Sequence, residues 1–316
     1  MTNEENQLKK RKVVHKSDKT AETVPDKNKT LGSLPTFPNQ RLWSRSVLII
    51  GLLLFIWYKS SSKNGNITLA KQSEILANKG SMFDCDADYS KEVTSYPECI
   101  PNVCGRLVTD KLITGTEADM LHKIAQRGFA LGGSDGGASI FDLHSGALSF
   151  KTKFVNVLAL NESKRILSPI DVSTYKLVMN KIKGAVVHAF KIDPHSLYLT
   201  KPTFFSKLTN IPPVTEHDKY WMPHVDKETY GSFHYTSLLY LSDFGMDFKG
   251  GRLTFIDKQA NVTIEPRKGR VAIFTSGAEN FHFVERVSEG TRYAITISFT
   301  CNKFEKNDQQ ILGFNL

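Results

Sequence analysis

Cysteine is scarce in this sequence of 316 residues, which contains four of them and none before Cys85. No two are spaced as Cys-x2-Cys, the pair on which many structural zinc sites are built, so a zinc ribbon is not expected. An even number of cysteines favours disulfides in an oxidising compartment. We expect one bridge within Cys85, Cys99 and Cys104 and a second that joins the remaining one to Cys301, although the spacing alone allows three connectivities.

The sequence also lacks the signature of a nucleic-acid-binding protein. Its formal net charge is +9, but about half of that excess lies before residue 46, and no predicted helix carries a Lys/Arg stripe. The glycine-rich stretch 131–138 lacks the Gly-Lys-Ser/Thr ending of a phosphate-binding loop, so we interpret it as a mobile loop near a pocket. We therefore expect no nucleic-acid partner.

The first 45 residues are polar, Lys-rich and poor in aromatic residues, which predicts a disordered tail. The cluster Lys9-Lys10-Arg11-Lys12 has the composition of a nuclear localisation signal, but it also suits a solvated cytoplasmic tail that fixes membrane topology. We favour the second interpretation because of the segment that follows.

Residues 46–58 carry no charge and are predicted to cross the lipid bilayer as a signal anchor. Thirteen residues are few for a span, which needs about 20, but Leu42 and Trp43 can extend the segment. The basic side comes first, so the positive-inside rule places the N-terminus in the cytosol and the remainder in the lumen. We expect a single-pass type II protein of the endoplasmic reticulum or Golgi, since a short span suits thin membranes.

Residues 59–105 are predicted to form a lumenal stem that contains three of the cysteines. Three Asn-x-Ser/Thr sequons, at Asn66, Asn161 and Asn261, are candidate glycosylation sites on the lumenal side. Residues 106–200 are predicted to form a helical buttress and the N-terminal part of the catalytic domain. The expected helices run from Thr114 to Gly128 and from about Asp171 to Phe190, where apolar residues recur at helical spacing.

Short segments rich in β-branched and aromatic residues alternate with turns in the last third of the chain. The turn signals are Gly250-Gly251, 266–270 and 288–290. This spacing is typical of a β-sandwich or barrel. The predicted strands are 233–241, 252–256, 271–274 and 291–300.

His224 and Asp226 form a His-x-Asp pair that lies just before these strands. In an extended segment, residues i and i+2 project to the same side, so an imidazole and a carboxylate can reach one ion. His282 is a candidate third ligand. Two histidines and one carboxylate with open coordination positions are the ligand set of non-haem Fe(II) oxygenases.

Arg292 lies on the predicted strand 291–300, ten positions after His282. Its face of the strand continues with Ala294, Thr296 and Ser298, which suits the lining of a cavity, while the other face is apolar. A guanidinium can hold a carboxylate through two parallel hydrogen bonds. We therefore predict that Arg292 binds a ligand that ends in a carboxylate.

Taken together, these motifs resemble the prolyl-4-hydroxylase-like branch of the Fe(II)/2-oxoglutarate dioxygenases over roughly residues 201–302. The segments that carry the resemblance are 224–226, 236–242, 250–251, His282 and 290–293. The resemblance implies an α+β fold in which helices support a double-stranded β-helix, or jelly roll. It places the catalytic core at 201–303 and leaves 304–316 as a C-terminal tail.

The resemblance also implies a mechanism. Fe(II) would be held by His224, Asp226 and His282, and 2-oxoglutarate would bind to the iron and, through its 5-carboxylate, to Arg292. Tyr220 resembles a tyrosine that helps to hold this cosubstrate, and Thr236 and Tyr240 are further pocket candidates. O2 and 2-oxoglutarate would be consumed, succinate and CO2 released, and L-ascorbate would act as a cofactor.

The substrate is not identified by the sequence, which allows a protein, with prolyl hydroxylation as the nearest association, or a small molecule. Three function classes compete: an active dioxygenase, a catalytically inactive jelly roll that serves as a binding module, and a metal-free structural domain. The first is favoured because all three candidate ligands and Arg292 are present.

Overall fold

The computed structural model describes residues 38–61, 66–99, 101, 103–159, 166–308 and 311–312. The chain divides into two compact units, Met1–Tyr58 and Lys59–Leu316. The first 37 residues, which include most of the predicted disordered tail, lie outside the described residues, as does Asn161.

Helix α1 spans Gln40–Ser61 and is longer at both ends than the predicted segment 46–58. It starts directly after Asn39, whose φ of 66° is left-handed. Residues 40–45, predicted to belong to the disordered tail, are therefore the first residues of this helix. Its 22 residues extend about 33 Å at 1.5 Å per residue. Within the described part of the chain, one segment is long and apolar enough to cross a membrane, Arg41–Lys59. The apolar helix is thus not short, and its length does not favour a thin membrane.

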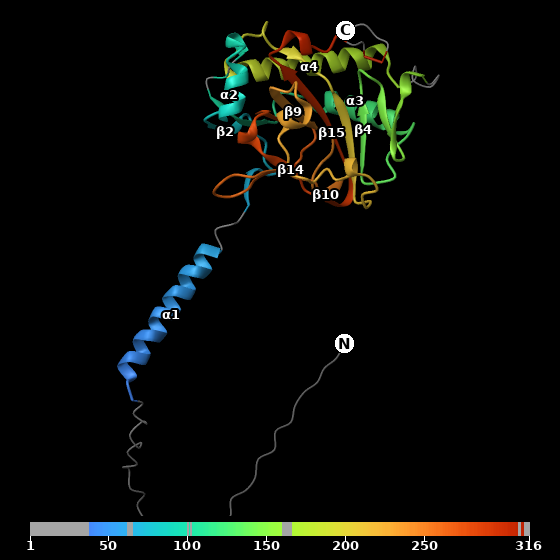
Figure 1. The fold of residues 1–316 in the computed structure, drawn as a ribbon. Coiled ribbons are helices and arrows are strands. Elements are labelled where there is room, and N and C mark those ends of the chain that lie inside the picture. The colour runs from blue at the N-terminus through green and yellow to red at the C-terminus, as the bar shows by residue number, and fades with distance from the viewer. Residues whose placement is uncertain are drawn as a thin grey trace, which may run out of the picture. The chain divides into compact units, whose positions relative to one another are not determined.

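The larger of two sheets has the strand order β2-β3-β13-β9-β15-β8-β4-β5-β6, with β7 and β10 also paired to β15 (Figure 1). The long strand β15 is central, because it pairs with both β8 and β9 in antiparallel register. These strands are β2 (Lys79–Phe83), β3 (Cys104–Thr109), β4 (Ala138–Asp142), β5 (Ala147–Phe150), β6 (Lys153–Asn156), β7 (Tyr198–Leu199), β8 (Phe204–Thr209), β9 (Tyr235–Tyr240), β10 (Phe248–Gly250), β13 (Val271–Thr275) and β15 (Val287–Thr300).

Helices α3 (Gly115–Phe129) and α4 (Pro169–Phe190) pack against one face of this sheet and enclose the main hydrophobic core. Leu121 of α3 and Ile182 of α4 are fully buried there with Ile295 and Ile297 of β15. Each helix begins with a capping box, at Thr114 for α3 and Ser168 for α4.

The predicted end of α3 at Gly128 is one residue early, because the helix continues to Phe129. A Cβ atom at Gly128 would lie 2.3 Å from the ring of Phe141, so this glycine permits close helix–sheet packing and does not end the helix.

The smaller sheet has the order β1-β12-β11-β14, and its strands are β1 (Ile67–Ala70), β11 (Leu253–Phe255), β12 (Val262–Ile264) and β14 (His282–Val284). A second apolar cluster joins it to the other face of the larger sheet. Leu253 and Phe255 are buried there with Phe274 and Ala294. The two faces of β15 thus contact different cores, as the alternation of its side chains predicts.

The segment 59–105 differs from the predicted stem, because it contributes to both sheets. β1 pairs in parallel with β12, and β2 pairs with β3. This segment also contains helix α2 (Ala87–Val93). The predicted C-terminal tail differs as well, since Ile311 and Leu312 are buried in the main core and the Leu312 amide donates to the Leu143 carbonyl at 3.1 Å.

One of two disulfides joins the segment 59–105 to the residue that follows β15, and the other closes a loop within that segment. Cys85 is bonded to Cys104, and Cys99 is bonded to Cys301, 202 positions later. The first is the expected bridge within the first three cysteines, and the second is the expected pairing with Cys301.

Candidate functional site

His224 and His282 are paired through their backbones at the edge of the smaller sheet. The His224 amide donates to the His282 carbonyl at 2.9 Å, and the reverse bond is 3.1 Å. The chain remains extended through Val225, and helix α5 (Asp226–Tyr230) then begins at Asp226. The His-x-Asp pair therefore begins in an extended segment, as predicted, but its second member, Asp226, already starts a helix.

The structure brings His224, Asp226 and His282 together, with one potential ligand atom from each lying within 4.8 Å of the others. The Nε2 atoms of His224 and His282 lie 3.4 and 3.8 Å from Oδ1 of Asp226. Among the residues that the structure describes, this is the one group of three such side chains with metal-ligand geometry.

Both imidazole rings are oriented by backbone carbonyls. Nδ1 of His224 lies 2.9 Å from the Met222 carbonyl, and Nδ1 of His282 lies 2.7 Å from the Asn280 carbonyl. Since a carbonyl can only accept, each Nδ1 carries the proton, and each Nε2 lone pair is left for an ion beside Asp226.

The electrostatics of this group depend on Asp226. Burial disfavours the imidazolium of His224, but the hydrogen bond and the charge of Asp226 outweigh burial and raise its pKa. Burial lowers the pKa of His282, and Asp226 offsets only part of that effect. Burial would raise the pKa of Asp226, but the neighbouring His282 and His224 outweigh it and lower the pKa. A buried carboxylate between two imidazoles is a suitable site for a divalent cation.

These three residues line a pocket of about 260 Å³ between the two sheets, and Arg292 of β15 lines the same pocket. Arg292 is 1% exposed, and its Nε and Nη2 atoms have no hydrogen-bond partner within the described structure. Complete burial lowers its pKa, but a guanidinium remains charged. A buried cation with unpaired donors is costly unless a ligand supplies acceptors, and a carboxylate matches its geometry.

The other predicted pocket residues lie close to Arg292 or to the three ligands. Tyr220 lines the pocket, and its hydroxyl accepts from the Val287 amide at 2.8 Å and donates to the Thr209 carbonyl at 3.3 Å. Thr236 also lines the pocket, and its hydroxyl is hydrogen-bonded to that of Ser276 at 2.9 Å.

Tyr240 differs from its prediction, since it is fully buried beside Arg292 and does not line the pocket. The Arg292 guanidinium lies 5.3 Å from the centre of the Tyr240 ring. The Tyr240 hydroxyl has no partner within the described structure, and burial raises its pKa to about 12.

Several lining residues were not predicted from the sequence. Phe204, Ser206 and Leu208 occupy alternate positions of β8, and Tyr230 ends the helix that Asp226 begins. The alternation of β8 was a usable signal for the first three. His217 is exposed and also contributes to the lining of the pocket.

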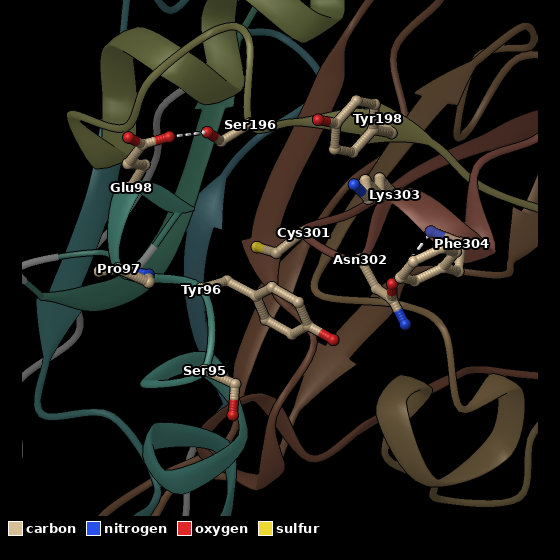
Figure 2. Close-up of a pocket in the computed structure, with 10 residues that line it drawn as sticks. All are labelled: Ser95, Tyr96, Pro97, Glu98, Ser196, Tyr198, Cys301, Asn302, Lys303 and Phe304. Carbon is tan, nitrogen blue, oxygen red and sulfur yellow. Dashed lines mark hydrogen bonds between the residues drawn. The ribbon is translucent and has the colours of Figure 1, made fainter.

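A second pocket, of about 450 Å³, is larger, but its described lining contains no group of potential metal ligands (Figure 2). It is lined by aromatic residues such as Tyr96, Tyr198 and Phe304 and contains Cys301, whose sulfur is already in a disulfide. Its carboxylate, Glu98, accepts a hydrogen bond from Ser196 at 2.7 Å. The smaller pocket is therefore the candidate active site.

Two candidate glycosylation sites fall within the described residues. Asn66 is exposed directly before β1, and Asn261 is partly exposed directly before β12. They lie side by side, because the Ile67 amide donates to the Asn261 carbonyl at 2.8 Å.

Comparison with known proteins is consistent with this site. The family model for the 2OG-Fe(II) oxygenase superfamily matches residues 211–300, which include all three candidate ligands and Arg292. A Xenopus tropicalis protein named 2-oxoglutarate and iron-dependent oxygenase domain-containing protein 3 is 48% identical over 266 residues, covering 83% of this chain and 84% of its own. Human prolyl 3-hydroxylase 2 is 36% identical over 80 residues, covering 24% of this chain and 11% of its own.

The solved structure of a Pseudomonas putida prolyl-4-hydroxylase covers 68% of this chain and 97% of its own, with 15% identity and a TM-score of 0.42. That overlay is too weak to support an argument, so the assignment depends on the sequence relatives and the family model. The extent of the Xenopus match is decisive, and the chain belongs to the family of 2-oxoglutarate and iron-dependent oxygenase domain-containing protein 3, within the 2OG-Fe(II) oxygenase superfamily.

Proposed function

We propose that the protein is a membrane-anchored, lumenal dioxygenase that depends on Fe(II) and 2-oxoglutarate and hydroxylates a protein substrate. One observation carries the proposal: the pocket that contains His224, Asp226 and His282 also contains a buried Arg292 with unpaired donors. The first group suits the iron, and the second suits the far carboxylate of 2-oxoglutarate.

The donor set fits Fe(II) because it leaves coordination positions for other ligands. Bound Fe(II), together with 2-oxoglutarate and O2, supplies the oxidising chemistry that inserts one oxygen atom into the substrate and one into succinate, with loss of CO2. The protein's own residues position these reactants. The Met222 and Asn280 carbonyls fix the two imidazoles, so that both Nε2 atoms are directed toward Asp226.

At the other end of the pocket, Arg292 orients the cosubstrate. Its unpaired Nε and Nη2 atoms offer donors to the 5-carboxylate. Tyr220 forms part of the same wall. Phe274 and Leu253 make the surroundings apolar, which strengthens these polar contacts and excludes water.

A prolyl residue is the first substrate to test, since prolyl 3-hydroxylase 2 is among the sequence relatives. The alternative is a catalytically inactive binding module with the same jelly roll. The complete set of candidate ligands favours the enzyme, because a module that only binds has no need of open metal positions.

The proposed topology follows from α1 and from the two disulfides. The helix has the length and composition of a span, and none of its apolar window is buried. Disulfides form in oxidising compartments, which supports a lumenal catalytic unit of the endoplasmic reticulum or Golgi.

We further propose three features of this lumenal unit. Glycans are attached at Asn66, Asn161 and Asn261, and L-ascorbate is a cofactor. The two sheets form a double-stranded β-helix.

Succinate release tests this function. The full-length protein in detergent is incubated with Fe(II), 2-oxoglutarate and ascorbate, with and without a proline-rich peptide. We expect succinate from the wild type and none from Asp226→Ala. Metal binding without any succinate, across a panel of peptides and lumenal extracts, would instead support the inactive module.

A further inference from the structure

The larger sheet contains a buried arginine next to the candidate metal site. Arg106 of β3 is 2% exposed, and each nitrogen of its guanidinium has a hydrogen-bond partner. Nη2 and Nη1 lie 2.8 and 3.2 Å from the carboxylate oxygens of Asp257, and Nε donates to Oδ1 of Asn280 at 3.0 Å. One side chain therefore links β3 to the segment after β11 and to the turn before β14.

Asn280 connects Arg106 to a metal-ligand candidate through hydrogen bonds. Its Nδ2 donates to the Thr275 carbonyl at 2.8 Å and to the Gly105 carbonyl at 3.3 Å, while its Oδ1 accepts from Arg106, so both ends of the amide are held. Its backbone carbonyl lies 2.7 Å from Nδ1 of His282. Because this carbonyl fixes the proton on Nδ1, the position of Asn280 determines which nitrogen of His282 faces Asp226.

A ring contact provides a second connection to the same imidazole. The Arg106 guanidinium lies 4.1 Å from the centre of the Phe255 ring. Phe255 is paired with His282 across β11 and β14, and their ring centres are 5.6 Å apart. Arg106 thus restrains both the ring that packs on His282 and the carbonyl that orients it.

We propose that Arg106 is a positioning residue for His282, acting through Asn280 and Phe255 to hold Nε2 in the geometry that metal binding needs. This inference deepens the proposed function and rests on it. The guanidinium fork is essential, because a lysine at position 106 cannot reach Asp257 and Asn280 at the same time.

Arg270, directly before β13, provides a matched control. It is 0% exposed, and its guanidinium is likewise held by a carboxylate, that of Asp110, at 2.8 and 2.9 Å. Its other partners are the Glu265 and Glu74 carbonyls, neither of which belongs to a candidate ligand. Arg106→Lys and Arg270→Lys therefore each remove a buried guanidinium fork that is held by an aspartate.

The experiment measures Co(II) affinity of the full-length protein by competition with a chelator, together with thermal unfolding. We expect both lysine variants to unfold at lower temperature than the wild type. Arg106→Lys should bind Co(II) about 10- to 100-fold more weakly, the usual effect of losing support behind a metal ligand, whereas Arg270→Lys should stay within about twofold. Equal affinities for Arg106→Lys and wild type, or equal losses in both variants, would overturn the proposal.

Two further measurements keep the test decisive. Asp257→Asn weakens the charged partner of Arg106 near the surface and is expected to fold, with a Co(II) affinity between those of wild type and Arg106→Lys. In the metal-free protein, nitrogen NMR of labelled histidine should show a proton on Nδ1 of His282 in the wild type and a mixture of tautomers in Arg106→Lys. Unchanged values in both measurements would contradict the proposal. Absence of Co(II) binding in the wild type would instead refute the proposed function.

Discussion

Replacing Arg292 with methionine is expected to stabilise the free protein and to weaken its binding of 2-oxoglutarate. The guanidinium is 1% exposed, and two of its nitrogens have no partner within the described structure. Each unpaired buried donor costs about 1–3 kcal/mol, so the two nitrogens together cost about 2–6 kcal/mol. The contact with the Tyr240 ring, 5.3 Å away, returns about 2 kcal/mol of this. Methionine fills similar space without this cost, so the free energy of unfolding should rise by up to about 4 kcal/mol.

The same substitution removes the proposed partner of the 2-oxoglutarate 5-carboxylate. Loss of a buried, charge-assisted pair costs about 2–5 kcal/mol, or roughly 30-fold to several thousand-fold in Kd. The assay combines thermal unfolding of the ligand-free protein with calorimetric titration of 2-oxoglutarate into protein loaded with Mn(II). For a domain of this size, each kcal/mol shifts Tm by about 2–4 °C.

Arg270→Met is the control, since this arginine is equally buried but fully paired with Asp110. Its removal leaves an unpaired buried carboxylate and should lower the free energy of unfolding by about 3–5 kcal/mol. Opposite shifts in Tm for the two methionine variants are therefore expected. A lower Tm for Arg292→Met with unchanged 2-oxoglutarate affinity would show that Arg292 serves only the fold.

Three other predictions concern the metal ligands, the pH dependence of stability and one close contact. Asp226→Ala should abolish metal retention, measured by elemental analysis, while circular dichroism stays that of the wild type. Burial lowers the pKa of His234 to about 3 from its usual 6.5, so the unfolded chain binds the extra proton between these values. Unfolding free energy should fall by up to about 1.4 kcal/mol per pH unit as the pH drops through this window, and His234→Asn should flatten the slope in acid-unfolding curves. Gly136→Ala should cost about 1–3 kcal/mol in urea unfolding, because the new Cβ would lie 2.3 Å from the Asp218 carboxylate, whereas Gly115→Ala meets nothing within 4 Å and should not destabilise.

Most residues of the candidate site could be predicted from the sequence, because a few side chains of distinctive chemistry define it. His224 and Asp226 are two positions apart, and the alternation of β15 separates Arg292 from the apolar face that contains Ile295 and Ile297. Such local signals depend only on the period of a strand. The helical start at Asp226 was missed, since a short helix of five residues has no periodicity to detect.

Strand pairings and polar contacts between segments that are far apart in the sequence were not predicted. Nothing local in residues 67–70 indicates that β1 adds in parallel to β12, almost 200 positions away. The roles of Arg106 and Asn280 were equally hidden, because a basic and an amide residue are usually exposed, and only the fold shows them buried against each other. Polar residues that support a site become recognisable only when the three-dimensional contacts are known.

The central claim is that His224, Asp226 and His282 hold one metal ion that the 2-oxoglutarate beside Arg292 also contacts. Equilibrium dialysis of labelled 2-oxoglutarate under argon, with and without Fe(II), tests it most directly. We expect one 2-oxoglutarate per chain, bound tightly only when one Fe(II) is present, and no Fe(II)-dependent binding in His282→Ala. Binding that is independent of iron, or that survives loss of His282, would contradict the claim.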